Sequence, residues 1–136
     1  MKRVIQLFCL VLIVSMVLAI PAFAAEQASD YFAAHSSYIL EVSDSEFQVW
    51  FHVTAVDGMD VLGVSEIKVQ YSTDTVNWST VKTYSGQYAY NTGSHNGYVT
   101  YSSVTSSGYY RAKVTYYAEN DSGTAEYANY TPFVSY

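Results

Sequence analysis

A chain of 136 residues, 50% of them hydrophobic, is long enough for one domain with a modest core. Its formal net charge is −6, which argues against nucleic acid as a partner, because a basic surface is the usual footprint there. The same excess of acidic groups argues against binding to an anionic membrane surface.

The N-terminal segment has the pattern of a secretory signal peptide. Two basic residues precede an apolar run over residues 4–20. A small-x-small pattern ends at Ala24, so cleavage is expected between Ala24 and Ala25. An uncleaved membrane anchor is the alternative, since a span needs ~20 apolar residues. The sequence thus predicts a signal peptide over residues 1–24, a secreted, extracellular protein, and no membrane contact after cleavage.

The expected mature chain contains no cysteine, because the single Cys9 lies inside the signal segment. No disulfide can therefore stabilise it, and its stability must come from a packed core. Residues 25–37 are mostly small and polar, and they predict a flexible leader. Residues 38–136 are expected to form one folded domain.

Seven stretches of the chain have the composition or the alternation of β-strands, because Tyr, Thr and Val favour strands and no helical periodicity appears. In chain order they are residues 38–42, 46–55, 65–72, 78–84, 98–104, 109–118 and 124–130. Turn signals separate them about every eight to twelve residues, which is typical of a β-sandwich. The sequence therefore predicts an all-β protein, a single antiparallel β-sandwich of about seven strands, preceded by a signal-peptide helix.

Two of these stretches alternate most clearly. In residues 46–55 the apolar side chains share one face with each other, and Trp50 and His52 lie on the other face. In residues 109–118 the core face is expected to carry Tyr110, Ala112, Val114 and Tyr116. Both patterns are typical of a strand with one buried face and one solvated face.

The connecting segments are read from their turn residues. Residues 57–60 predict a turn, and residues 119–123 predict a hairpin turn with glycine at a position of positive φ. Residues 85–97 are rich in Gly, Asn and Ser and predict the longest loop, in which Gln87–Tyr90 is a candidate short edge strand. Pro132 places the last piece at an edge or a bulge, because proline cannot donate to a strand ladder.

Parts of the domain resemble known β-sandwich families. Residues 67–74, followed by Trp78, resemble the C to C′ hairpin of fibronectin type III domains, and residues 116–123 resemble their F to G hairpin. Residues 106–112 resemble the approach to strand F of immunoglobulin domains. This resemblance implies that Tyr110 is a tyrosine corner, with a buried ring and a hydroxyl bonded to the preceding corner. Both disulfide cysteines of immunoglobulin domains are missing.

As a whole, the chain resembles small secreted proteins of Gram-positive bacteria of unknown function. Such a resemblance implies a compartment and a fold rather than an activity, because sandwich folds carry many functions.

Catalysis and metal binding have little support in the sequence. The three histidines, His35, His52 and His95, lie in no known catalytic motif, so no enzyme activity and no cofactor are expected. Asp57 and Asp60 are weak candidate ligands for calcium, with Asp44 or Glu46 as further oxygen donors. An ordinary solvated turn is the alternative interpretation of these aspartates.

Surface aromatic groups are the strongest functional signal. Tyr109 and Tyr117 are expected on the outer face of their strand, while the long loop gathers Tyr88, Tyr90, Asn91, His95 and Asn96. Aromatic rings beside amide and hydroxyl groups suit stacking on sugar rings and hydrogen bonding to their hydroxyls. The alternatives are cross-strand pairs that only stabilise the sheet, and general protein recognition.

Three functions remain open from the sequence. The first is a non-catalytic extracellular binding or structural module whose partner is an unknown protein or glycan. The second is a carbohydrate- or cell-wall-binding protein, which an exposed row of three or more coplanar aromatic side chains would favour. The third is a secreted enzyme or toxin-like effector, which a pocket joining His52 or His95 to a carboxylate would favour.

Overall fold

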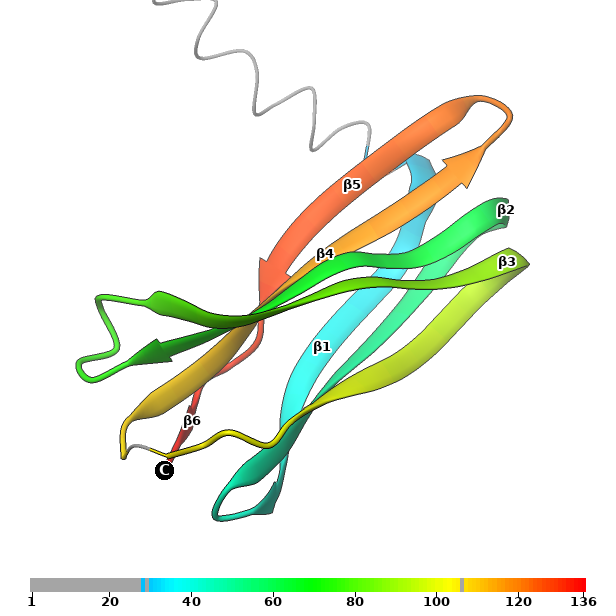
Figure 1. The fold of residues 1–136 in the computed structure, drawn as a ribbon. Coiled ribbons are helices and arrows are strands. Elements are labelled where there is room, and N and C mark those ends of the chain that lie inside the picture. The colour runs from blue at the N-terminus through cyan, green and yellow to red at the C-terminus, as the bar shows by residue number, and fades with distance from the viewer. Residues whose placement is uncertain (1–27, 29, 106) are drawn as a thin grey trace, which may run out of the picture.

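The computed structural model describes residues 28, 30–105 and 107–136. The expected signal peptide, including the cleavage site at Ala24 and Ala25, lies outside these residues. The described chain is all-β and forms one curled antiparallel sheet (Figure 1). Its strands are β1 (Phe32–Ser43), β2 (Glu46–Ser72), β3 (Ser79–Tyr101), β4 (Tyr109–Asn120), β5 (Gly123–Tyr130) and β6 (Val134–Ser135).

The long hairpin of β2 and β3 organises the sheet. The first part of β2 pairs with β1 on one side and with the end of β3 on the other. From Val61 onward, β2 pairs with the beginning of β3 and with β4, and β4 in turn pairs with β5 and β6. The β1 half therefore contains β1 with residues 46–54 of β2 and residues 94–101 of β3. The β4 half contains β4, β5 and β6 with residues 61–72 of β2 and residues 79–90 of β3.

The hairpin changes direction between Thr54 and Met59, where the register of β2 against β3 shifts. On β3 the same region contains Asn91, whose φ is 52°, a left-handed conformation that Asn tolerates. Figure 1 shows the hairpin folding back on itself here, so that β1 lies across from β4. The turn expected at residues 57–60 is wrong, because β2 stays extended through them, although its pairing with β3 is interrupted between Thr54 and Met59.

Short turns connect the remaining strands. The β4–β5 hairpin closes around Asn120 and Gly123, which are direct partners in the register. Gly123 has a φ of 141°, so the expectation of a positive-φ glycine in this turn is confirmed. Between β2 and β3, the carboxylate of Asp74 accepts bonds from the backbone N–H groups of Val76 and Asn77 at 2.9 and 2.8 Å. These bonds hold the pKa of Asp74 well below its usual range.

The core lies inside the curl, where side chains from the two halves meet. Phe47 of the β1 half packs against Tyr110 of β4 with ring centroids 5.5 Å apart. The expected inward faces of residues 46–55 and 109–118 are confirmed, because their alternate side chains are buried. The largest fully buried side chains are Tyr116, Phe47, Leu62, Ile67, Val49, Val53, Val64, Val69 and Val114. Alternation with period two thus explains which face of each strand is inside.

The C-terminal residues form hydrogen bonds with the segment just before β4. Gly108 and Tyr136 exchange two backbone hydrogen bonds of 2.8 and 2.9 Å. The hydroxyl of Tyr71 donates to the carbonyl of Ser107 at 2.8 Å, which ties the same corner to β2. Tyr110 has the buried ring expected of a tyrosine corner, and its hydroxyl bond to the corner stays a prediction.

Two boundaries differ from the sequence expectations. β1 begins at Phe32, so residues 32–37 of the expected leader are part of the sheet and pair with β2. The expected loop over residues 85–97 is wrong, because this segment continues β3 and pairs with β2 on both sides of the bend. The candidate edge strand Gln87–Tyr90 within it is confirmed, since these residues pair with β2 alone. Among the described residues, no helix is long and apolar enough to cross a membrane.

Candidate functional site

A row of three aromatic side chains crosses the outer face of the β1 half. Tyr38, Trp50 and Tyr98 are direct register partners across β1, β2 and β3. The centroids of Tyr38 and Trp50 are 6.3 Å apart with planes 2° from parallel, and Trp50 stacks on Tyr98 at 4.6 Å and 28°. Tyr38 is 51% exposed and Tyr98 is 48% exposed. These three residues are called the aromatic row.

Strand alternation exposes the aromatic row to solvent. The neighbours of each row residue along its strand point inward, and Val49, Phe51 and Val99 are buried. No described strand pairs with the free edge of β1 or with the free edge of this part of β3. Each terminal tyrosine of the row therefore keeps one flank that no neighbouring strand covers.

Polar side chains border the aromatic row on both sides. Gln48 lies two residues before Trp50 and accepts a hydrogen bond from its indole N–H at 2.9 Å, which fixes the indole. On the other side, His52 is a direct partner of Ser36 on β1 and of Asn96 on β3. Amide, hydroxyl and imidazole groups thus surround a rigid aromatic strip.

Of the residues predicted from sequence, Tyr88 and Tyr117 are brought together on the outer face of the β4 half. Their ring centroids are 5.6 Å apart in an edge-to-face arrangement. The Tyr117 hydroxyl donates to the carboxylate of Glu119. This bond, with a smaller contribution from burial, raises the pKa of Tyr117 to about 12. Burial and the carboxylate of Glu126 raise the pKa of Tyr88.

Tyr109 lies at the other end of β4, away from this pair. Its ring contacts Phe133 edge-to-face, with centroids 5.4 Å apart. Beside it, the guanidinium of Arg111 lies 4.2 Å from the ring centroids of both Trp78 and Tyr130. The expected outward direction of Tyr109 and Tyr117 is consistent with their half-buried state, but the two tyrosines do not form one site.

The remaining predicted residues are spread over β3 rather than gathered in a loop. Tyr90 is 67% exposed and lies opposite Val61, and Asn91 lies at the bend. His95 points inward, with its ring 5.4 Å from Phe51, and this burial lowers its pKa. Asn96 alone of this set borders the aromatic row.

The three histidines lie in different surroundings, and the expectation about enzyme activity stays a prediction. His52 lies on the exposed outer face, within 3.1 Å of the Thr54 hydroxyl. His35 lies between the rings of Tyr116 and Tyr127, with centroids 4.8 and 4.6 Å away. Neither His52 nor His95 lines the hollow beside Glu41 and Asp44 or the hollow beside Glu66 and Lys113.

Asp57 and Asp60 lie at the bend of β2, where both are exposed. Among the residues that the structure describes, no group of three or more His, Cys, Asp or Glu side chains could hold a metal ion. Calcium binding by these two aspartates therefore stays a weak prediction from the sequence.

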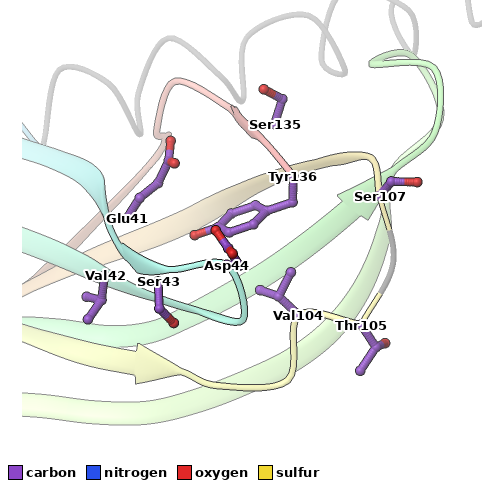
Figure 2. A pocket seen from close by; sticks show the side chains of 9 residues that line it. All are labelled: Glu41, Val42, Ser43, Asp44, Val104, Thr105, Ser107, Ser135 and Tyr136. Carbon is purple, nitrogen blue, oxygen red and sulfur yellow. The ribbon is translucent and has the colours of Figure 1, made fainter.

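A hollow of about 530 Å³ lies at the end of the molecule where β1 turns into β2 (Figure 2). Glu41 and Asp44 line it, opposite Ser135 and Tyr136. Burial and these two carboxylates raise the pKa of the Tyr136 hydroxyl. The hollow gathers acidic and hydroxyl groups without a buried charged side chain directed into it, so it is a weaker candidate than the aromatic row.

Sequence reasoning missed the aromatic row because its members come from three separate strands. Alternation predicts that Trp50 faces outward, but its partners Tyr38 and Tyr98 depend on the register of β1 and β3. The available signal was the alternation itself, which places an aromatic residue on the outer face of each strand. No protein-family model, curated protein or solved structure matches this chain.

Proposed function

We propose that this chain is a secreted, non-catalytic binding module that recognises a glycan through the aromatic row. The observation that carries the proposal is the direct alignment of Tyr38, Trp50 and Tyr98 on an exposed sheet face. An aromatic ring presents an apolar surface to the C–H groups of a sugar, while nearby amides and hydroxyls bond its hydroxyl groups. The N-terminal signal pattern supports an extracellular glycan, including one of the cell wall.

The pairing order supports an immunoglobulin-like or fibronectin type III-like β-sandwich as the scaffold. If β2 and β3 are each divided at the bend, the chain has seven strand segments besides β6, in groups of three and four. In such a sandwich the aromatic row lies on the outer face of the three-stranded group. A rigid sheet is a suitable support for a binding site, because the side chains are held before the ligand arrives.

The alternative role of the aromatic row is stabilisation of the sheet alone. Exposed cross-strand aromatic pairs contribute roughly 0.2–1 kcal/mol each, so they do stabilise the β1 half. Stabilisation does not require three large rings in one exposed row, since buried pairs would serve as well. A contiguous exposed aromatic surface with polar borders is typical of a binding site.

The test is retention of the chain from Ala25 onward on insoluble cell wall and on a panel of insoluble polysaccharides. The double variant Tyr38→Ala/Tyr98→Ala should lose at least about tenfold in affinity, because it removes two of the three rings. Near-UV circular dichroism should show a folded variant, since both side chains are half exposed.

Two control variants separate the aromatic row from other surface tyrosines. Tyr90→Ala removes a tyrosine that is 67% exposed but lies outside the row, and it should leave retention unchanged. Tyr117→Ala removes a ring from the outer face of β4, and it should leave the affinity for a soluble oligosaccharide, which contacts a single row, unchanged. Equal retention by the wild type and the folded row variant would exclude the row as the glycan site.

A further inference from the structure

The outer face of the β4 half carries its charges in two separate groups. Of the four Lys and Arg side chains in the described chain, three lie on this face, namely Lys68, Arg111 and Lys113. The acidic side chains Glu119 and Glu126 lie toward the other end of β4 and β5. One end of the face is therefore basic and the other end is acidic, with Glu66 between them beside Thr115.

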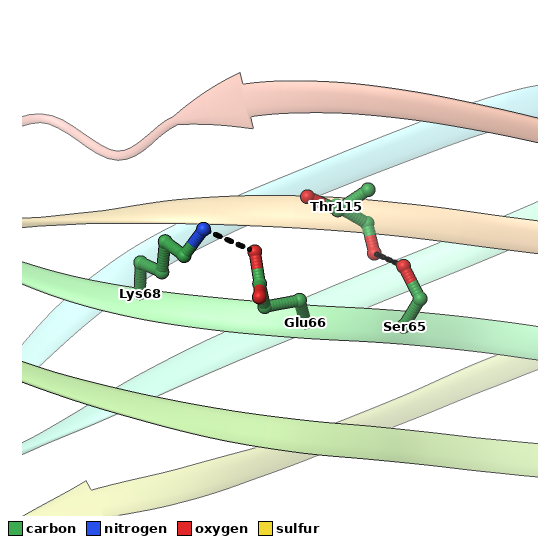
Figure 3. A network of polar contacts seen from close by, with 4 residues as sticks. All are labelled: Ser65, Glu66, Lys68 and Thr115. Atoms are coloured by element: carbon green, nitrogen blue, oxygen red, sulfur yellow. Dashed lines mark hydrogen bonds and ion pairs between the residues drawn. The ribbon is translucent and has the colours of Figure 1, made fainter.

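The basic group contains a like-charge pair within the sheet. Lys68 of β2 and Lys113 of β4 are direct register partners, an arrangement that destabilises an isolated sheet. Lys68 is paired with Glu66 at 2.9 Å (Figure 3). Lys113 forms no ion pair with any residue that the structure describes. An external carboxylate would therefore relieve the repulsion at Lys113.

Arg111 is held in place beside these lysines. Its guanidinium is stacked 4.2 Å from both Trp78 and Tyr130, and its Nε donates to Gln70 at 2.8 Å. A charge fixed in this way loses little side-chain freedom when a partner binds. The same end also exposes Phe133, which gives the face an apolar border.

The positions of these charges match a two-fold axis that crosses β4 at Thr115. Arg111 lies four residues before Thr115, and Glu119 lies four residues after it. A two-fold rotation about this axis therefore places Arg111 of one protomer opposite Glu119 of the other. Glu126 is the direct neighbour of Tyr117 on β5, which brings it diagonally to Lys113 of the second copy. Such a self-complementary surface is what an isologous dimer requires.

The centre of the face is open to such a partner. A hollow of about 550 Å³ lies there between β2, β4 and β5, lined by Glu66, Lys113, Thr115 and Glu126 among others. In a symmetric dimer, the hollow of one protomer would face the same hollow of the other protomer. Aromatic side chains lie toward both ends, which supplies apolar contacts around the charged centre.

From this arrangement we infer that the outer face of the β4 half is a dimer interface for a second copy of the chain. Lys113 and Arg111 of each protomer face Glu126 and Glu119 of its partner. The aromatic row lies on the β1 half and stays exposed in the dimer. The dimer therefore presents two rows, and a polymeric ligand that reaches both is bound with higher avidity than one row provides.

The test is sedimentation velocity of the protein exported with its own N-terminal segment, at low and at high salt. The wild type should form a dimer that weakens at high salt, because screening reduces attraction between exposed charges. Lys113→Glu and Glu126→Lys should each weaken the dimer at least about tenfold, since each places like charges together.

The charge exchange supplies the decisive control. An equimolar mixture of the Lys113→Glu and Glu126→Lys variants should recover the dimer, because both contacts between unlike protomers again join opposite charges. The double variant Lys113→Glu/Glu126→Lys should recover it alone for the same reason. A wild type that is monomeric at low salt and high concentration overturns the inference. A dimer that both single variants leave intact overturns it too.

Discussion

At the residue scale, His35 is a titratable side chain held among aromatic rings. Its ring lies between Tyr116 of β4 and Tyr127 of β5, with Phe32 6.4 Å away on β1. Its Nδ1 atom is buried and has no hydrogen-bond partner among the described residues. Burial therefore favours the neutral imidazole and lowers the pKa of His35 below its usual value.

We predict that this histidine makes the protein less stable in mild acid. Below pH 6.5 the unfolded chain takes up a proton at His35 more readily than the folded chain does. The free energy of unfolding therefore decreases as the pH is lowered. Above that pH the ring is neutral in both states and its full contribution is present. Urea unfolding at about pH 7.5 and about pH 5.5 measures the difference.

His35→Phe should reduce this loss of stability, because phenylalanine fills the same aromatic site without taking up a proton. His95, which burial against Phe51 also shifts downward in pKa, should contribute in the same direction. The matched control is His52→Phe, since the His52 ring is exposed on the outer face. Identical pH dependence in the wild type and in His35→Phe would contradict the account of His35.

At the element scale, the hairpin of β2 and β3 depends on a close approach at Gly63. Gly63 is buried, pairs with Tyr88 on β3 and with Tyr117 on β4, and leaves no room for a side chain. A Cβ atom at this position would collide with the backbone carbonyl of Gln87. Gly63 therefore lets three strands pack closely where the hairpin leaves the bend.

We predict that Gly63→Ala lowers the free energy of unfolding by about 3 kcal/mol or more, because backbone cannot move aside as a flexible side chain can. Gly58→Ala is the matched control, since no atom lies within 4 Å of the position its Cβ would take. Its effect should stay within about 0.5 kcal/mol. Urea unfolding followed by circular dichroism measures both, and equal effects would contradict the proposed close packing.

The elements also show where sequence patterns predict structure and where they do not. Period-two alternation predicts the inward faces of residues 46–55 and 109–118, because burial depends on the face of the strand alone. The Gly, Asn and Ser of residues 85–97 predict a loop, yet long-range pairing with β2 overrides this local preference. Gly97 in this segment faces Phe51, so a small residue there serves packing rather than a turn.

At the scale of the whole molecule, the sequence predicts the all-β class but not the aromatic row. Strand propensity is a property of the local sequence, so strands can be predicted without knowing how they pair. The aromatic row depends on register between strands far apart in sequence, and Tyr38 is 60 residues from Tyr98. Of the residues predicted for a ligand site, Asn96 borders the row, and Tyr88 and Tyr117 meet on the β4 half.

The central claim is that a glycan binds at the aromatic row, and Trp50 supplies its most direct measurement. The chain has two tryptophans, so Trp78→Phe leaves Trp50 as the only one and keeps an aromatic ring beside Arg111. Titration of this variant with a soluble oligosaccharide from a retained polysaccharide should change the Trp50 emission saturably. Saturable binding seen by calorimetry without any change in Trp50 emission would place the ligand elsewhere and contradict the claim.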